Sequence, residues 1–211
     1  MKHIYLASQF YVSGLAISQK ISDEQKQNTV FITTPIKYKN FKESELDWHY
    51  KNRNTLKEGG FICDDYDIAG KSEEDLVRDL ANYSVMYVEG GDPFFLLKQA
   101  ESNNFVNYVI KRVDEGMIYV SESAGSVIAG IDIRANGRPG KNAEKYGLTN
   151  TSGINFINAV FMPHWGLESK RMDYSEHKFP QTYNEDHAHI FLPNNCYIEV
   201  TGNSFKIISM S

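Results

Sequence analysis

The sequence is poor in cysteine, has no long apolar run and carries no excess of positive charge. Its 211 residues include two cysteines, Cys63 and Cys196, outside any C-x-x-C spacing. Two cysteines are too few for a disulfide scaffold, and we expect both to be reduced thiols. Lysine and arginine total 22 against 27 aspartates and glutamates, and the net charge of −5 argues against a nucleic-acid partner. No stretch approaches the roughly 18 consecutive apolar residues of a membrane helix.

The amino-terminal residues also lack a secretion signal, because Ser8 and Gln9 interrupt the apolar run that begins at Ile4. We therefore expect a cytoplasmic protein without a membrane partner. The hydrophobic fraction of 41% and the charged fraction of 23% are ordinary for a globular protein. Since no internal repeat, low-complexity tract or linker divides the chain, residues 1–211 are predicted to form a single domain.

Strand-length apolar segments alternate with stretches long enough for helices. Ser72 is predicted to be the N-cap of one such helix, which is expected to end near Tyr83. Continuous apolar strands separated by helices are typical of a parallel sheet covered on both faces, and they predict an open α/β sheet. The predicted strands of this sheet are Ile4–Ala7, Val30–Thr34, Phe61–Cys63, Val85–Val88 and Met117–Val120.

The last third of the chain has a different pattern. Residues 132–152 contain three glycines and a proline and predict a long surface loop beside the site. Shorter apolar segments follow, and the final two, joined by Thr201-Gly202-Asn203-Ser204, predict a hairpin at the sheet edge. These segments are Ala159–Met162, His189–Leu192, Cys196–Val200 and Phe205–Ile208.

The strongest chemical signal follows the strand that ends near Val120. The residues Ser121-Glu122-Ser123-Ala124-Gly125 pass from a buried strand through small side chains into a helix. This arrangement is typical of a nucleophile elbow, in which a tight turn exposes a serine hydroxyl and the next backbone N–H faces a developing oxyanion. Ser121 stands where the usual motif has glycine. A helix start with small residues for packing is the alternative.

Two further strand ends carry candidate residues. Gly90 and Gly91 follow the Val85–Val88 strand and precede a helix with Asp92 as its N-cap and Pro93 at its first position, so their N–H groups could bind an oxyanion or only form a tight turn. His164 ends the Ala159–Met162 strand, where it could serve as the general base of a serine. The His187-Ala188-His189 pair has no third ligand in sequence, and no metal or other cofactor is predicted.

Taken in order, Gly-Gly-Asp, Glu-Ser-Ala-Gly and Pro-His-Trp-Gly resemble the peptidase E family, which includes alpha-aspartyl dipeptidases and is related to cyanophycinase. The resemblance extends from the Ile4 strand to the Ile198 strand. It implies a doubly wound, mostly parallel three-layer α/β/α sandwich similar to class I glutamine amidotransferases. It also implies that Ser123 is the nucleophile, that His164 is the general base, and that the N–H groups of Gly91 and Ala124 form the oxyanion hole, with Gly90 as a further candidate.

One position departs from the family pattern. Members carry a carboxylate after the strand that follows the histidine, whereas this chain has Leu192-Pro193-Asn194-Asn195. Asn194 would then be the third member of the triad, able to orient His164 but without a charge to stabilise the imidazolium. In a serine protease the corresponding Asp-to-Asn change lowers kcat by about 10⁴. Another carboxylate could take this role, and the nearest in sequence are Glu185, Asp186 and Glu199.

Charged residues near these motifs are candidates for substrate binding. Glu122 could bind a substrate ammonium or only face a neighbouring loop. The side-chain carboxylate of an N-terminal aspartate would require a cation, and Arg171 is the predicted residue, with Lys170, Arg134 and Arg138 as alternatives.

The sequence therefore predicts a serine peptidase that cleaves small peptides, among which dipeptides with N-terminal aspartate are the family's signature substrates. The candidate assembly is a homodimer. The alternative is a catalytically weakened relative that binds a small ligand. An α/β-hydrolase esterase is disfavoured, because there the acid precedes the histidine in the chain. A flavodoxin-like nucleotide binder is a further alternative, since such folds host many functions.

Overall fold

The computed structural model describes residues 2–183 and 186–210. Its strands are β1 (His3–Ala7), β2 (Thr29–Ile32), β3 (Cys63–Tyr66), β4 (Val85–Val88), β5 (Ile118–Glu122), β6 (Val160–Trp165), β7 (His189–Pro193), β8 (Cys196–Thr201) and β9 (Ser204–Ser209). Its α-helices are α1 (Phe10–Ser18), α2 (Asp23–Lys26), α3 (Asp47–Glu58), α4 (Glu73–Asp79), α5 (Pro93–Ser102), α6 (Phe105–Asp114), α7 (Ala124–Ile128) and α8 (Phe179–Thr182). A π-helix spans Asp173–Lys178.

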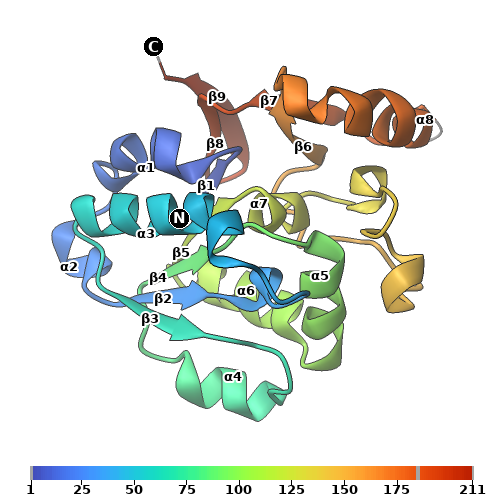
Figure 1. The fold of residues 1–211 in the computed structure, drawn as a ribbon. Coiled ribbons are helices and arrows are strands. Elements are labelled where there is room, and N and C mark those ends of the chain that lie inside the picture. The colour runs from blue at the N-terminus through green and yellow to red at the C-terminus, as the bar shows by residue number, and fades with distance from the viewer. Residues whose placement is uncertain (1, 184–185, 211) are drawn as a thin grey trace.

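A seven-stranded sheet runs through the centre of the molecule in the order β3-β2-β4-β5-β1-β8-β9 (Figure 1). The five strands from β3 to β1 are parallel, and β8 and β9 complete the sheet as antiparallel strands. The predicted α/β sheet and edge hairpin are therefore confirmed. Because β4, β5 and β1 are neighbours, the residues that follow them lie at one edge of the sheet, where ligands of open α/β sheets bind.

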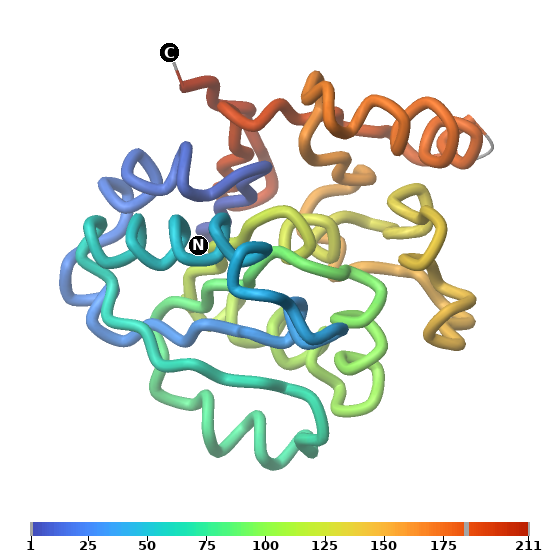
Figure 2. The backbone as a smooth tube through the Cα atoms, viewed as in Figure 1, coloured from blue at the N-terminus to red at the C-terminus, as the bar shows by residue number. Residues whose placement is uncertain are grey.

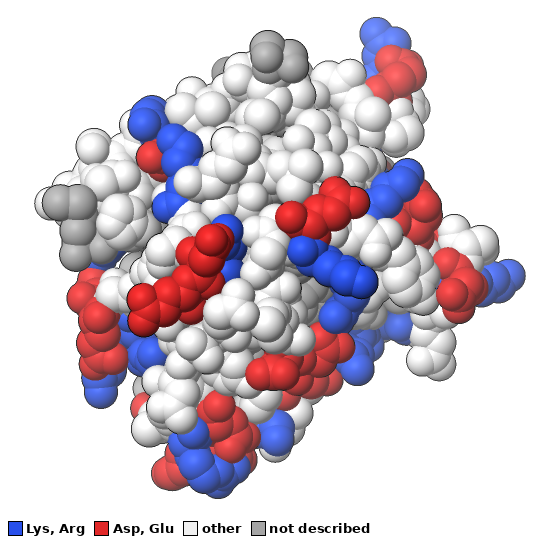
Figure 3. Space-filling view, turned by 90° about the vertical axis from the view of Figure 1, so that its left-hand side faces the viewer, with Lys and Arg blue, Asp and Glu red and all other residues white. Residues whose placement is uncertain are grey.

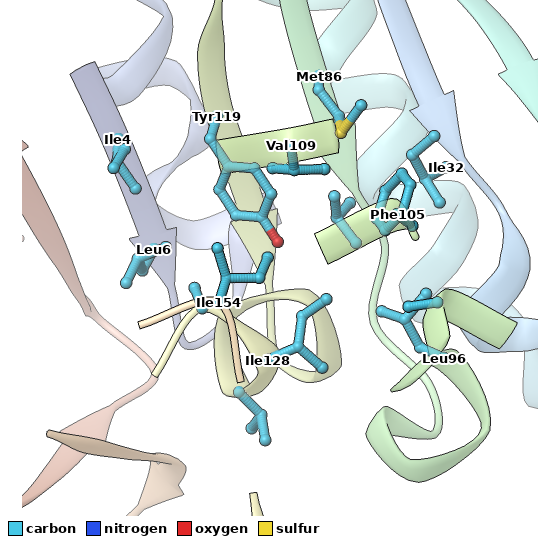
Figure 4. Close-up of a cluster of buried hydrophobic side chains, with 14 of the residues drawn as sticks. Ile4, Leu6, Ile32, Met86, Leu96, Phe105, Val109, Tyr119, Ile128 and Ile154 are labelled. Atoms are coloured by element: carbon cyan, nitrogen blue, oxygen red, sulfur yellow. The ribbon is translucent and has the colours of Figure 1, made fainter. Parts of the chain in front are cut away.

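Helices cover both faces of the sheet and give the predicted three layers. Alternate residues of each strand face opposite sides. One set, which includes Tyr5 and Tyr87, packs with residues of α1 and α3 such as Phe10 and Leu56. The other set packs with α4, α5, α6 and α7 in a larger apolar cluster (Figure 4). The cluster contains Ile4, Met86, Leu96, Val109, Tyr119 and Ile128.

The sequence located most of the strands but not their limits. The strand predicted at Phe61–Cys63 is instead β3, whose residues are polar and half exposed, so it has no apolar signature. Ser72 caps α4 as predicted and accepts a hydrogen bond from the Asp75 N–H. That helix ends at Asp79, earlier than the predicted Tyr83, with Leu80 at its C-cap.

Strands β6 and β7 form a separate two-stranded parallel sheet, which the sequence did not reveal. Figure 2 shows residues 160–183 and 186–193 crossing the end of the main sheet between the β8–β9 hairpin and the loop 132–152. The loop lies beside the site as predicted, but it contains two short 3₁₀ turns and is closed by a bridge between Asp132 and Ser152. These additions place segments from the second half of the chain over the carboxyl ends of the parallel strands.

The described residues contain no helix that is long and apolar enough to cross a membrane. Lysine and arginine side chains alternate with aspartate and glutamate over the face shown in Figure 3.

Gly125, in the first turn of α7, is predicted to be intolerant of any side chain. A Cβ there would lie 2.4 Å from the Val88 carbonyl oxygen, which belongs to backbone and cannot move aside cheaply. We expect Gly125→Ala to lower the free energy of unfolding by about 2 kcal/mol, as overpacking does. Urea unfolding followed by circular dichroism measures this loss. Gly137→Ala is the control, because its Cβ would come no closer than 3.0 Å to any atom; equal losses in the two variants would contradict the prediction.

Candidate active site

Ser123 occupies the sharp turn between β5 and α7. Its backbone angles, φ 44° and ψ −103°, lie in a region that residues other than glycine rarely adopt. The Ser123 N–H donates to the Ala7 carbonyl oxygen at 3.1 Å, which ties the turn to the end of β1. Strain of this kind persists only where the surrounding structure enforces it, and it occurs preferentially at functional sites.

His164 reaches Ser123 from an irregularity in β6. The pairing register between β6 and β7 shifts between Pro163 and Trp165, and His164, with a φ of 65°, lies at that shift. Extra residues of this kind redirect a side chain out of the ladder. The His164 Nε2 atom is 3.0 Å from Ser123 Oγ, which is hydrogen-bonding distance.

Asn194, in the turn after β7, contacts the other ring nitrogen of His164. Its Oδ1 lies 2.8 Å from His164 Nδ1. Ser8, buried directly after β1, receives the His164 N–H at 2.8 Å and donates its own proton to Asn194 Oδ1 at 3.2 Å. Because the amide oxygen is the acceptor for Ser8, it also accepts the proton of Nδ1. His164 Nε2 then carries the lone pair that accepts the Ser123 hydroxyl proton.

Ser8 was missed by the sequence reasoning, although the signal was available. It follows an apolar parallel strand directly, as the serine and glycine candidates do. None of the acidic alternatives to Asn194 replaces it among the described residues. Asp186 is exposed, and Glu199 pairs with Lys20 and Lys206. Glu185 lies outside the described residues.

Burial lowers the pKa of His164 from 6.5 to about 4. The Asn194 hydrogen bond opposes this shift, whereas the positive charges of Lys170, Lys178 and Arg138 add to it. The imidazole is therefore neutral at pH 7, as a general base must be, but it is a weaker base than a histidine paired with a carboxylate.

The predicted oxyanion donors do not all remain available. Gly91 and Ala124 line the same pocket as Ser123 and His164, and within the described residues their N–H groups have no hydrogen-bond acceptor. The N–H of Gly90, the further candidate, already donates to the Glu89 carboxylate at 3.2 Å. Gly91 adopts a φ of +142°, and a Cβ there would lie 2.1 Å from the Pro35 carbonyl oxygen, so glycine is required.

The pocket over Ser123 has a volume of about 280 Å³, and positive side chains dominate its charged lining. Its cationic residues are Arg138, Lys141, Lys170 and Lys178. Burial lowers the pKa of Lys141 to about 8 and that of Lys178 to about 7. Such lowering means that these ammonium groups lack a close carboxylate partner to offset their desolvation, and an anionic ligand would supply one.

Arg171, predicted to bind substrate, is not among the residues of this pocket. Its side chain is 73% exposed and its Nη1 pairs with Glu168 at 3.1 Å, three residues away on the same turn. Of the alternatives named from sequence, Lys170 and Arg138 line the pocket. Lys141 and Lys178 gave no signal, because the loop and the π-helix that carry them have no motif and their approach depends on the tertiary fold.

Glu122 lines the pocket and is almost completely buried. Its Oε2 accepts the N–H of Phe10, the first residue of α1, at 3.0 Å, so part of its carboxyl group faces a neighbouring helix. Burial, with the nearby Glu89 charge, raises its pKa from 4.5 to about 8. A role in binding a substrate ammonium stays a prediction.

Metal binding has no support in the geometry. No group of three or more histidine, cysteine, aspartate or glutamate side chains in residues 2–183 and 186–210 is arranged to hold an ion. His189 stacks on Phe191 in β7.

Comparisons with known proteins identify the family to which this fold and sequence are similar. Residues 15–208 match the family model of peptidase family S51. The chain is 25% identical to the uncharacterized peptidase Lmo0363 of Listeria monocytogenes over 166 residues, 78% of each protein. It is also 25% identical to the uncharacterized peptidase PM1590 of Pasteurella multocida over 165 residues, again 78% of each protein.

Two crystal structures share the fold. One is a protein from Listeria monocytogenes EGD-e described as a peptidase E, with a TM-score of 0.81, 21% identity and complete coverage of both chains. The other is a peptidase from an acI-B1 Actinobacterium, with a TM-score of 0.68 and 12% identity, covering 100% of this chain and 88% of that one.

The raised pKa of Glu122 predicts a pH-dependent cost to stability. Between about pH 4.5 and 8 the folded chain retains a proton that the unfolded chain releases, so this group's contribution to stability decreases as the pH rises through that window. We expect Glu122→Gln, which is neutral at every pH, to raise the Tm relative to wild type by more at pH 8.5 than at pH 5. Thermal unfolding at both pH values measures the difference. Glu58→Gln, at an exposed position of α3, controls for the loss of one charge, and a Glu122→Gln effect that is equal at the two pH values would refute the prediction.

Proposed function

Because the chain belongs to peptidase family S51, we propose that it is a serine-type peptidase in which Ser123 is the nucleophile and His164 the general base. The observation that carries the proposal is the 3.0 Å contact between Ser123 Oγ and His164 Nε2. The serine lies on a strained turn, beside two unpaired backbone N–H groups. These are the parts that acyl transfer requires: a nucleophile, its base and a site for the oxyanion.

The reaction follows from the positions of these groups. Ser123 Oγ attacks the scissile carbonyl carbon while its proton passes to His164 Nε2. The N–H groups of Gly91 and Ala124 hold the resulting oxyanion. The C–N bond then breaks, and His164 returns the proton to the leaving amine. A water molecule, deprotonated by the same imidazole, hydrolyses the acyl-enzyme and regenerates Ser123.

The pocket favours a small substrate that carries a carboxylate. Its volume is at the lower end of those that bind small molecules. An anionic group among Arg138, Lys170 and Lys178 would offset charges that depress the pKa of His164. Binding of such a substrate would therefore strengthen the base that the reaction needs. A dipeptide with an N-terminal aspartate, the substrate class implied by the family resemblance, has the required charge.

A catalytically weakened protein that binds a small ligand is the second candidate. The neutral Asn194 favours it, because an amide cannot stabilise the imidazolium that forms when His164 takes the proton. The two candidates differ in whether Ser123 reacts, and this can be tested without knowing the substrate.

An active peptidase should be labelled by a fluorophosphonate at Ser123. We expect intact-mass analysis to show one adduct on the wild type and on Ser126→Ala, a buried neighbouring serine, but none on Ser123→Ala. The rate of labelling should fall to half its plateau near pH 4, because protonation of His164 below that pH removes the base. Absence of an adduct on the wild type would favour the ligand-binding alternative.

Asn194→Asp should make the site more reactive. A carboxylate 2.8 Å from His164 Nδ1 would raise the pKa of the imidazole and stabilise its protonated form. We expect the acid limb of the labelling profile to move up by at least about one pH unit, with a plateau rate at least about tenfold higher. Asn195→Asp, one residue on and exposed, adds the same charge away from the ring. If both variants behave as wild type, Asn194 does not act on the base.

A further inference from the structure

Glu89 is a completely buried acidic residue that takes no part in the reaction described above. It follows β4 directly and lies two residues before Gly91, a proposed oxyanion donor. A buried carboxylate is costly unless charged or polar partners surround it. The hydrogen-bond partners of Glu89 therefore indicate which parts of the structure its carboxylate holds in place.

Side chains of helix α3 hold the Glu89 carboxylate on one side. His49 Nδ1 lies 2.8 Å from Glu89 Oε2, and Asn52 Nδ2 donates to Oε1 at 3.0 Å. The tautomer of His49 is fixed, because Arg53 Nε donates to His49 Nε2 at 3.1 Å. His49 Nδ1 therefore carries the proton and donates it to Glu89. Arg53 is in turn held by Asp65, through contacts of 2.7 and 2.8 Å.

On its other side the carboxylate holds the backbone of the glycine turn. Glu89 Oε1 accepts the Gly90 N–H at 3.2 Å. The same turn is fixed beyond Gly90, since Lys141 Nζ donates to the Gly91 carbonyl oxygen at 3.2 Å and the Asp92 N–H donates to the Pro35 carbonyl oxygen at 2.9 Å. A glycine pair has wide conformational freedom, so these restraints determine where the Gly91 N–H points.

We propose that Glu89 is a positioning residue of the oxyanion hole: held by His49 and Asn52, its carboxylate fixes the Glu89–Gly90 peptide and thereby restricts the Gly90–Gly91 peptide that follows, so that the Gly91 N–H faces the carbonyl attacked by Ser123. This inference rests on the proposed function. Glu89 touches neither the substrate nor the reacting atoms. Its effect is on the geometry of a donor, and small displacements of such donors have large effects on rate.

The fluorophosphonate reaction can test this role, because the phosphoryl oxygen occupies the oxyanion hole as Ser123 attacks. The maximal labelling rate, kinact, reports the chemical step, and the half-saturating concentration, KI, reports binding. We expect Glu89→Ala to lower kinact by about 10- to 100-fold with KI unchanged within about twofold. Glu89→Gln keeps an oxygen for the Gly90 N–H but turns an amide donor toward His49, so it should recover most of the loss.

Met86→Ala is the matched control, since Met86 is equally buried in β4 but packs in the apolar cluster away from α3. It should lower the Tm without lowering kinact. If Glu89→Ala does not fold, Asn52→Ala replaces it, because it releases Glu89 Oε1 from α3; a fall in kinact of about tenfold is expected there.

The outcomes separate the two proposals. A kinact for Glu89→Ala within twofold of wild type, or a fall that Met86→Ala reproduces, overturns the positioning role while the peptidase proposal stands. A rise in KI with kinact unchanged also overturns it, because Glu89 would then act on binding. If wild type itself is not labelled at Ser123, the proposed function fails, and the role of Glu89 fails with it.

Discussion

The site depends on a single backbone constraint, the forced turn at Ser123. The parallel ladders of β5 with β4 and β1 fix where β5 ends, and the Ser123 N–H bond to Ala7 holds the turn against the next strand. Gly125 allows α7 to start in contact with the backbone of Val88. The energy of the strained conformation is thus supplied by a large, well-packed sheet, and the hydroxyl is presented without an ordered loop of its own.

His164, which contacts that hydroxyl, and Asn194, which contacts His164, come from a different part of the fold. His164 belongs to β6 and Asn194 to the turn after β7, and in the described part of the chain these two strands form a sheet separate from the main one. Ser8 joins the two parts, because it receives the His164 N–H and donates to Asn194 from the end of β1. A residue that follows a strand of the central sheet therefore helps to set the distance between His164 and Ser123. Ser8 is completely buried at this junction.

The sequence predicted what local pattern determines. Apolar strands, the N-cap at Ser72 and the candidate Ser123 are visible from residue type and order. His164 is only a weak candidate on that basis, and Asn194 became a candidate through the family resemblance. Sequence reasoning failed where tertiary contacts decide. The β3 strand is polar and was misplaced, and the sequence did not point to Lys141 and Lys178, which line the pocket. Nor did it show that the Gly90 N–H donates to the Glu89 carboxylate. In each case the missing information is which residue packs opposite the one in question.

The charged side chains around the site act on the pKa of His164. Burial makes His164 a weak base, and the positive charges of Lys170, Lys178 and Arg138 lower its pKa further. The Asn194 hydrogen bond opposes this shift, but a neutral amide brings no negative charge to stabilise the imidazolium. A carboxylate in the place of Asn194 would raise the pKa of the imidazole and stabilise its protonated form whether or not a ligand is bound. With an amide instead, a negative charge that favours proton transfer in the proposed reaction would have to come from the ligand. Three of the pocket cations, Lys170, Lys178 and Arg138, add to the lowering of the His164 pKa that burial causes, so binding of an anionic substrate would also change the basicity of His164.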